Sequence, residues 1–187
     1  MHTLQTKRLT LRQWRDEDYP AFASLNSDAD VMRFFPNRLS REQSDAMLNR
    51  LRGNIERNGW GFWAAEHRDS GQLMGFVGLN TPTAQLPFNP CVEIGWRLAK
   101  AFWRQGFASE AAALSLRYGF EQLELDSIVA FSPVANIGSQ AVMKKIGMHN
   151  TGEDFAHPAV TADSGLQSHV LYRIHQHQWR QADRLIY

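Results

Sequence analysis

The sequence predicts an α/β (α+β) fold in which antiparallel strands come first and strand–helix units follow. Residues 60–67 and 73–80 are strand-like and flank a short turn, a pattern typical of a β-hairpin. Residues 91–98 and 127–134 are also strand-like, and a segment with helical spacing of apolar residues follows each of them. No repeat, low-complexity segment or linker divides the chain. We therefore expect one domain over residues 1–187.

The other elements of the first half have recognisable start and stop signals. Residues 8–14 alternate leucines with polar residues and predict the first strand. Asp16 is the expected N-cap of a first helix. Ser40 and Gln43 have the spacing of a capping box, and the helix that they open is expected to end at Asn58-Gly59.

In the second half, a helix is expected from about Ser109 to Phe120 and a shorter one over residues 136–147, with Gly147 as its stop. Residues 169–177 predict the last strand. Within residues 91–98, alternation places Glu93 on the face opposite Ile94.

The composition is that of a globular protein, with 43% hydrophobic and 21% charged residues. Twenty basic and 19 acidic residues give a net charge of +1, which offers no electrostatic footprint for nucleic acid or an anionic membrane. Cys91 is the one cysteine, so no internal disulfide can form and a reducing compartment is favoured. The first residues lack the apolar core of a signal peptide, and no run has membrane-spanning length. We expect a soluble, cytoplasmic protein.

The segment 103–109, WRQGFAS, lies between a predicted strand and a predicted helix. Backbone N–H groups at a helix start form a nest for anions, and the helix dipole adds positive charge there. Gly106 allows a close backbone approach, and Arg104 can contact a phosphate. The segment therefore predicts a pyrophosphate site, although a tight turn with a surface arginine explains the same residues. The phosphate-binding motifs of P-loop and dinucleotide-binding proteins are absent from the sequence.

Four short motifs follow one another along the chain: Glu93–Trp96, Trp103–Ala108, Asn136–Ser139 and Lys145–Met148. Together they resemble the GCN5-related N-acetyltransferase (GNAT) superfamily, and within it the branch of ribosomal-protein N-terminal (Rim-type) acetyltransferases. The chain departs from the family at Trp103, where the family has Gln or Arg, and from the branch at Arg104, where glycine is common.

The resemblance implies a mixed, mostly antiparallel sheet of about seven strands flanked by helices, with a cleft between the fourth and fifth strands. It implies acetyl-CoA as acyl donor, no metal, and direct attack by an acceptor amine. The backbone near Trp96, Arg97 and Leu98 would pair with the pantetheine arm. The other residues that the resemblance assigns to acetyl-CoA are Arg104, Gln105, Gly106, Phe107, Ala108 and Ser109 at the pyrophosphate and Asn136 at the pantetheine arm.

Two residues are the predicted catalytic groups. Glu93 is the candidate base, acting directly or through water; the alternative is a glutamate paired with an arginine on a wet sheet face. In the resembling branch the serine at Ser139 protonates the departing thiolate, whereas Asn136 and Ser139 also suit an ordinary helix start. Tyr118 and Tyr172 do not match the position of the tyrosine acid that many members use.

Other reactive residues have weaker assignments. Cys91 is interpreted as a structural thiol. His175 and His177 alternate on the predicted last strand, where solvated polar residues are favoured over a metal site. His157 and His169 are candidates for the wall of the acceptor pocket.

Several alternatives stay open on the sequence alone. The acceptor can be a protein N-terminus, a polyamine, another small amine or an antibiotic, and the donor can be a longer acyl-CoA. A homodimer is compatible with the sequence. A different class of function, a non-catalytic acyl-CoA-binding module, would need the 103–109 segment but neither Glu93 nor Ser139.

Overall fold

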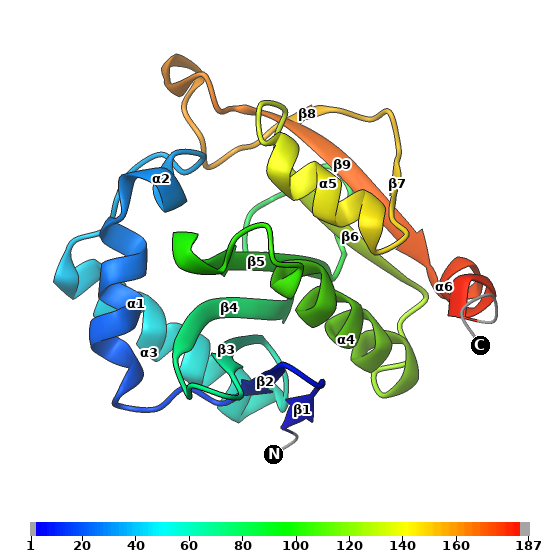
Figure 1. Ribbon diagram of the computed structural model, residues 1–187. Helices are drawn as coiled ribbons and strands as arrows, with labels where there is room; N and C mark the ends of the chain where they lie inside the picture. Colours follow the sequence, from blue (N-terminus) through cyan, green and yellow to red (C-terminus); the bar gives the residue numbers. More distant parts are fainter. Residues whose placement is uncertain (1–2, 184–187) are drawn as a thin grey trace.

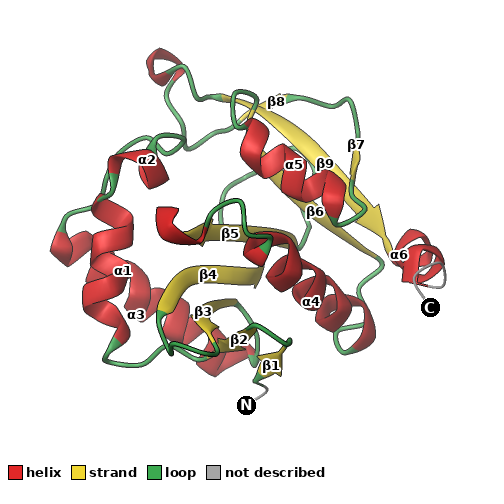
Figure 2. Ribbon diagram, in the orientation of Figure 1, coloured by secondary structure: helices red, strands yellow, loops and turns green. Residues whose placement is uncertain are grey.

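The computed structural model describes residues 3–183 and contains one open sheet with helices on both faces (Figures 1 and 2). The strand order is β1-β2-β3-β4-β5-β6-β9-β7, with β8 paired to β9. Every pairing is antiparallel except that of β5 with β6. The strands are β1 (Leu4–Gln5), β2 (Leu9–Arg12), β3 (Phe62–His67), β4 (Leu73–Asn80), β5 (Glu93–Leu98), β6 (Ser127–Pro133), β7 (His149–Asn150), β8 (Phe155–Ala156) and β9 (Ser168–His175). The helices are α1 (Asp18–Ser27), α2 (Ala29–Met32), α3 (Arg41–Asn58), α4 (Phe107–Glu121), α5 (Ile137–Lys145) and α6 (Gln176–Asp183).

The helices divide between the two faces of the sheet. Gly119 of α4 lies against the side chains of Leu79 and Ile128, so α4 covers the face to which the even-numbered residues of β5 belong. The Arg97 side chain reaches Asn26 of α1 on the opposite face. In Figure 1, α4 and α5 lie in front of the sheet, and α1 and α3 lie to its left. The hydrophobic core fills both layers, since β3 and β4 are buried along most of their length.

Several local predictions are confirmed. The strands β3 and β4 pair as the expected hairpin. The Ser40 hydroxyl accepts from the Gln43 N–H while the Gln43 side chain accepts from the Ser40 N–H, which completes the capping box of α3. Gly59 ends that helix at a φ of 79°, a left-handed conformation that favours glycine.

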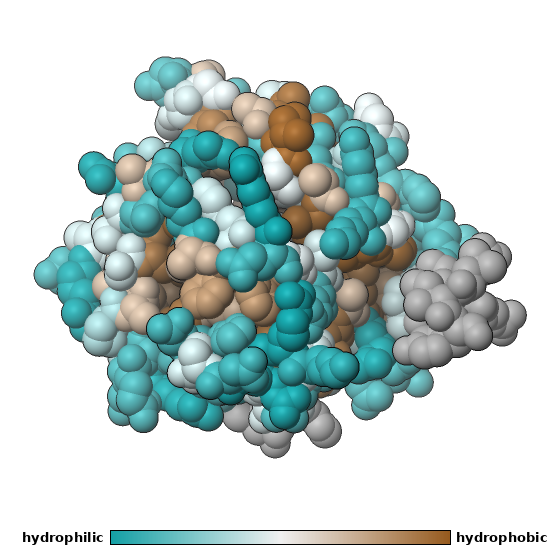
Figure 3. All heavy atoms as spheres, viewed as in Figure 1, coloured by the Kyte–Doolittle hydropathy of each residue, from teal (hydrophilic) through white to brown (hydrophobic). Residues whose placement is uncertain are grey.

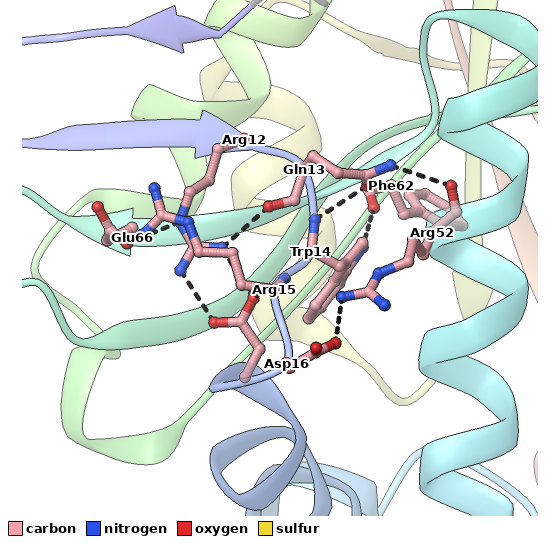
Figure 4. A network of polar contacts seen from close by, with 9 residues as sticks. Arg12, Gln13, Trp14, Arg15, Asp16, Arg52, Phe62 and Glu66 are labelled. Carbon is pink, nitrogen blue, oxygen red and sulfur yellow. Dashed lines mark hydrogen bonds and ion pairs between the residues drawn. The ribbon is translucent and has the colours of Figure 1, made fainter.

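The predicted N-cap of α1 is wrong. The cap position belongs to Glu17, whose side chain makes no capping bond. Asp16 instead accepts a hydrogen bond from Arg52 of α3 at 2.7 Å. Buried Asp18 pairs with buried Arg12 of β2, which also reaches Glu66 of β3 at 2.6 Å. This network ties β2 and β3 to the start of α1, and Figure 4 shows Arg12 and Arg15 directed at Glu66.

The strand count and several boundaries differ from expectation, most of the latter by one or two residues. The sheet has nine strands rather than about seven, because β1, β7 and β8 have two residues each and show no periodicity. The helix α4 begins at Phe107 rather than Ser109. The last strand ends at His175, so His177 lies in α6 and not on the strand. Within residues 3–183 no helix is long and apolar enough to cross a bilayer.

The strands β5 and β6 are joined at one end only. Glu93 pairs with Val129, and the Val129 N–H donates to the Val92 carbonyl at 3.0 Å. No later residue of β5 is paired with β6. The two strands diverge from that point, as Figure 1 shows, and the sheet is open between them.

Candidate active site

The N-terminal end of α4, called its mouth below, comprises Gly106 and the first residues of the helix. It presents backbone N–H donors that the helix does not use. The first helical hydrogen bond runs from the Glu110 N–H to the Gly106 carbonyl, so the N–H groups of Phe107, Ala108 and Ser109 have no partner inside the helix. Gly106 occupies the N-cap and provides no side-chain cap. These donors are therefore available to an anion.

The turn before the helix has an unusual backbone, with two residues in the left-handed region. Arg104 has a φ of 60° and Gly106 a φ of 84°, two left-handed residues on either side of Gln105. Only glycine adopts such a φ without cost, which explains Gly106. The turn is anchored by the Trp103 indole N–H, which donates to the Leu98 carbonyl at 2.7 Å, and by the Gln105 side chain, which donates to the Ala101 carbonyl.

Cations from two distant segments border this turn. A Cβ at Gly106 would lie 3.4 Å from a terminal nitrogen of Arg8 and 4.0 Å from Nζ of Lys145. Arg8 stacks on the Phe107 ring and pairs with Glu110; burial alone would raise the pKa of that carboxyl, but hydrogen bonds from Thr6 and Arg8 lower it. Lys145 forms no ion pair with any described residue, so its charge is free to face an anion.

On β5 the backbone of Trp96 faces the opening between the strands. The carbonyl of Val92 points toward β6, where it accepts from Val129. The backbone N–H and carbonyl groups of a strand change side at each residue, so every second residue faces the same way. Trp96, four residues after Val92, therefore also directs its N–H and carbonyl groups toward β6. The Leu98 carbonyl shares this direction but already accepts from Trp103. The backbone of Arg97 points toward β4, and its side chain is buried on the far face. Of the three residues predicted to pair with the pantetheine arm, Arg97 therefore has its backbone directed away from the opening, and Trp96 has both backbone groups directed into it.

Glu93 lies where β5 and β6 part. Its Oε1 accepts from the Asn80 amide at 2.7 Å, and no cation pairs with it among the described residues. Burial raises the pKa of Glu93 to about 7, and the bond from Asn80 opposes this only in part. The predicted alternative, a glutamate paired with an arginine, does not describe this environment.

Asn136 and Ser139 form a compact pair at the start of α5. The Asn136 side chain accepts from the Ser139 N–H at 3.1 Å, so it is the N-cap, and its amide donates to the Ser139 hydroxyl at 3.0 Å. Because Ser139 Oγ accepts this bond, its own proton is available to another acceptor. The helix-capping role and a chemical role for these two residues are therefore compatible.

The residues present fit an acyl-CoA. A pyrophosphate matches the free N–H groups and the left-handed glycine at the mouth of α4. On β6, the buried hydroxyl of Ser132 has no hydrogen-bond partner, and alternation places it on the face of α4 and α5. Figure 3 shows apolar surface on this face between polar chains, and the exposed large apolar residues, Val134 and Ile137, flank Asn136.

Other predicted residues lie away from this opening. Tyr118 packs edge-on against Trp63, and Tyr172 is buried in the core. Cys91 lies close enough to Glu93 to feel its charge; burial, and then that charge, raise the pKa of the thiol, which keeps it protonated. No three His, Cys, Asp or Glu side chains gather as a metal site in residues 3–180.

His157 and His169 do come together, on the Glu93 side of the sheet. Their rings are 4.9 Å apart and pack with Phe131 and Phe155, which in turn contact Phe88. The pKa of His157 is lowered by burial and by His169; that of His169 is lowered by burial, against a bond to the Gln167 carbonyl. These rings form a largely uncharged wall on the face of the sheet opposite α4. The sequence named His157 and His169 as candidates for the wall of the acceptor pocket, and that role stays a prediction.

Sequence reasoning missed Arg8 and Lys145 as neighbours of Gly106. Lys145 stands within a motif that the sequence did single out, but the motif gives no sign that its amine turns toward α4. Nothing near Arg8 in the sequence marks it, because its link to the site is a pairing with Glu110, about a hundred residues further along the chain.

Comparison with known proteins gives the family. The acetyltransferase (GNAT) domain family matches residues 8–149. The chain is 31% identical over 181 residues to the uncharacterized N-acetyltransferase YnaD of Bacillus subtilis, covering 96% of this chain and 99% of YnaD. A GNAT-family acetyltransferase from Bacillus anthracis has a crystal structure that superposes with a TM-score of 0.80 at 25% identity, covering 94% and 99% of the two chains.

A ribosomal-protein-S5-alanine acetyltransferase from Vibrio fischeri shares the fold, with a TM-score of 0.76 at 17% identity and coverage of 96% and 99%. At that identity the likeness extends to the fold alone. The family match covers most of the chain, and the GNAT relatives reproduce the mixed, mostly antiparallel sheet. The chain belongs to the acetyltransferase (GNAT) family.

Proposed function

We propose that this acetyltransferase moves an acetyl group from acetyl-CoA to a primary amine by direct attack in a ternary complex. The observation that carries the proposal is the Glu93 carboxyl, whose pKa is raised to about 7 where β5 and β6 part. A base with a pKa near the working pH is ionised in a substantial fraction of molecules and still accepts a proton readily. A buried carboxyl with a neutral partner has no evident structural purpose at this position.

On the donor side, the pyrophosphate binds the N–H groups at the mouth of α4, with Arg104 and Lys145 beside it. The pantetheine arm lies between β5 and β6, paired with the backbone of Trp96 and with Asn136. This arrangement brings the thioester to the point where the strands part, within reach of groups from both faces of the sheet.

The chemistry assigns one task to each group. An amine attacks only when neutral, and lysine-type and α-amines have ordinary pKa values of about 10.4 and about 7.7–8.0. Glu93 accepts the surplus proton, directly or through water. As the N–C bond forms and the C–S bond breaks, the Trp96 N–H donates to the carbonyl oxygen, where negative charge develops. The Ser139 hydroxyl gives a proton to the departing thiolate.

The acceptor is open between a protein N-terminus, a polyamine, another small amine and an antibiotic. The motif resemblance to the ribosomal-protein branch makes a protein N-terminus the first acceptor to test. The cytoplasmic location, the homodimer and the choice of acetyl over longer acyl groups also stay predictions.

Calorimetric titration with acetyl-CoA tests the donor, comparing wild type with the double variant Arg104→Ala/Gly106→Glu. We expect micromolar binding that the double variant loses. A thiol-release assay with a panel of peptides and amines then tests transfer, with Glu93→Gln and Ser139→Ala as variants. Binding without thiol release from any amine would favour a non-catalytic module. No binding at millimolar acetyl-CoA would overturn the proposal, and full turnover in both variants would overturn the assigned roles.

A further inference from the structure

A hollow opens on the Glu93 side of the sheet, where β5 and β6 begin. Its lining includes Phe88 from the loop before β5, Cys91, Val129 of β6 and Arg173 of β9. Phe88 packs edge-on against Phe155 at 5.0 Å and near Phe131 at 5.9 Å, so the hollow adjoins the wall of rings. The hollow lies away from the mouth of α4, and the donor chemistry does not use it.

The strand register places Glu93 and Arg173 on one face. Glu93 pairs with Val129, and Val129 pairs with Arg173, and directly paired residues have side chains on the same face. Neighbouring strands are about 4.8 Å apart, so the two Cα atoms are roughly 10 Å apart. Cys91 is close to both charges: that of Glu93 raises the pKa of the thiol and that of Arg173 lowers it, after the larger effect of burial.

Arg173 is a cation that has no partner among the residues that the structure describes. Its Nε is buried and has no hydrogen-bond partner, and the guanidinium forms no ion pair with any described residue. Asp126 also lines the hollow but forms no ion pair with Arg173. Partly desolvating an unpaired cation costs free energy, which a bound anion would recover.

The two buried arginines of the sheet show the contrast. Arg12 has carboxylate partners in Asp18 and Glu66. Arg97 donates to Asn26 and lies 3.9 Å from the centre of the Phe35 ring, so α1 and the loop after α2 cover it. The Nε of Arg97 also lacks a partner, but its guanidinium still has a hydrogen bond and a ring. Arg173 lines a hollow, and its side chain has no hydrogen-bond or ion-pair partner among the described residues.

We propose that Arg173 binds a carboxylate of the acceptor while the acceptor amine lies at Glu93, so that the substrate class is an amino carboxylate. The inference rests on the proposed amine acetylation and names its substrate class. A planar guanidinium pairs with a carboxylate through two parallel hydrogen bonds, and the adjoining rings exclude water from that pair. The carboxylate can belong to a free amino acid or to an acidic side chain of a peptide.

The test compares amines that differ only in a carboxylate. Values of kcat/KM are measured for β-alanine against ethylamine and for γ-aminobutyrate against propylamine, and for peptides with Glu against Gln at the second position. The enzymes are wild type, Arg173→Gln, Arg173→Lys and the control Arg50→Gln, which removes an exposed arginine of α3. The small-molecule and peptide arms separate the two sources of the carboxylate.

We expect Arg173→Gln to lower kcat/KM for the carboxylate member of a pair by about tenfold to a hundredfold, mainly through KM, and to spare its neutral partner. Arg173→Lys should retain part of the preference, and Arg50→Gln all of it. Equal effects on both members of every pair would overturn the inference while leaving amine acetylation intact.

A second readout does not depend on turnover. The Nε–H resonance of Arg173, assigned from its loss in Arg173→Gln, is followed by ¹⁵N NMR during titration with γ-aminobutyrate or propylamine. A shift with γ-aminobutyrate alone supports the inference. An unmoved resonance with every carboxylate overturns it, and a protein that binds the carboxylate but acetylates no amine refutes the proposed function instead.

Discussion

The donor side and the acceptor side of β5 are built in different ways. On the donor side, the 103–109 turn and the Asn136–Ser139 pair are short continuous segments, and their main contributions are backbone N–H groups and local hydrogen bonds. On the acceptor side, Glu93 of β5, the loop before it with Phe88, the loop with His157 and Arg173 of β9 are brought to one face only by the folded sheet.

This difference indicates which half of the site can accept amino-acid substitutions. The donor side depends on backbone geometry, so few sequences form it, and it suits a ligand that all members share. The acceptor side depends on side chains on the surface of a finished sheet, which can be exchanged without altering the fold. Acceptor choice should therefore respond to substitutions on the Glu93 face, and donor affinity to substitutions at α4.

Removing the base should have the largest effect. We expect Glu93→Gln to lower kcat for alkyl amines by about 10²–10⁴ and to leave acetyl-CoA affinity unchanged, because the carboxylate lies on the acceptor side. In wild type kcat should rise with pH through about 7, as Glu93 loses its proton, and the variant should lack this step. Thiol-release kinetics and calorimetry measure both quantities. Glu56→Gln, at an exposed position of α3, is the control. A parallel loss of acetyl-CoA binding in Glu93→Gln would contradict the division into two sides.

The donor side should be sensitive to backbone strain at one glycine. Gly106→Ala should weaken acetyl-CoA binding by about tenfold, since a φ of 84° costs a non-glycine residue roughly 1–2 kcal/mol and shifts the nest. Gly71→Ala is the matched control, with a φ of 67° and no atom within 4 Å of the new Cβ. Thermal unfolding should report similar destabilisation for both, and calorimetry a loss of affinity for Gly106→Ala alone. Equal affinities would show that the nest is not the phosphate site.

Glu93 should also reduce stability at high pH. Its pKa is about 7 in the folded chain and about 4.5 when unperturbed, so between these values the folded state binds the extra proton and stability falls as pH rises. Glu93→Gln removes this cost. We expect the variant to exceed wild type at pH 8 by on the order of 2 kcal/mol, and by less as pH falls toward 4.5. Urea unfolding at both pH values measures the difference, and a variant that is less stable at pH 8 would argue against a buried, destabilised carboxylate.

The smallest effect is expected from the cation that α5 adds to the donor side. Lys145→Ala should weaken acetyl-CoA binding about two- to fivefold at low salt and less at high salt, because its amine is exposed and screened. Lys144→Ala removes a neighbouring exposed charge and should change affinity little. Calorimetry at two salt concentrations provides the comparison. Equal losses of acetyl-CoA affinity in the two variants would show that Lys145 acts only through the net positive charge of α5 and makes no specific contact.

Local features of the sequence were predictable because they close over a few residues. The capping box at Ser40, the stop at Gly59 and the cap at Asn136 each depend on hydrogen bonds within one turn. The α4 turn was identified for the same reason. Asp16 shows the limit of such signals. It was expected to cap α1, but its carboxylate pairs with Arg52 of α3, a partner that lies far away in the sequence.

By itself the sequence determined the fold class, the strand-to-helix turn at residues 103–109 and the presence of Glu93 on a strand. Only the tertiary structure decided that Glu93 has a raised pKa and no cation partner among the described residues, and that Lys145 and Arg8 border Gly106. It also decided that Arg173 shares a face with Glu93. The physical reason is the sequence separation over which the interactions act. Backbone hydrogen bonding is fixed by neighbours in the chain, whereas burial and charge depend on which distant strands and helices pack around a group.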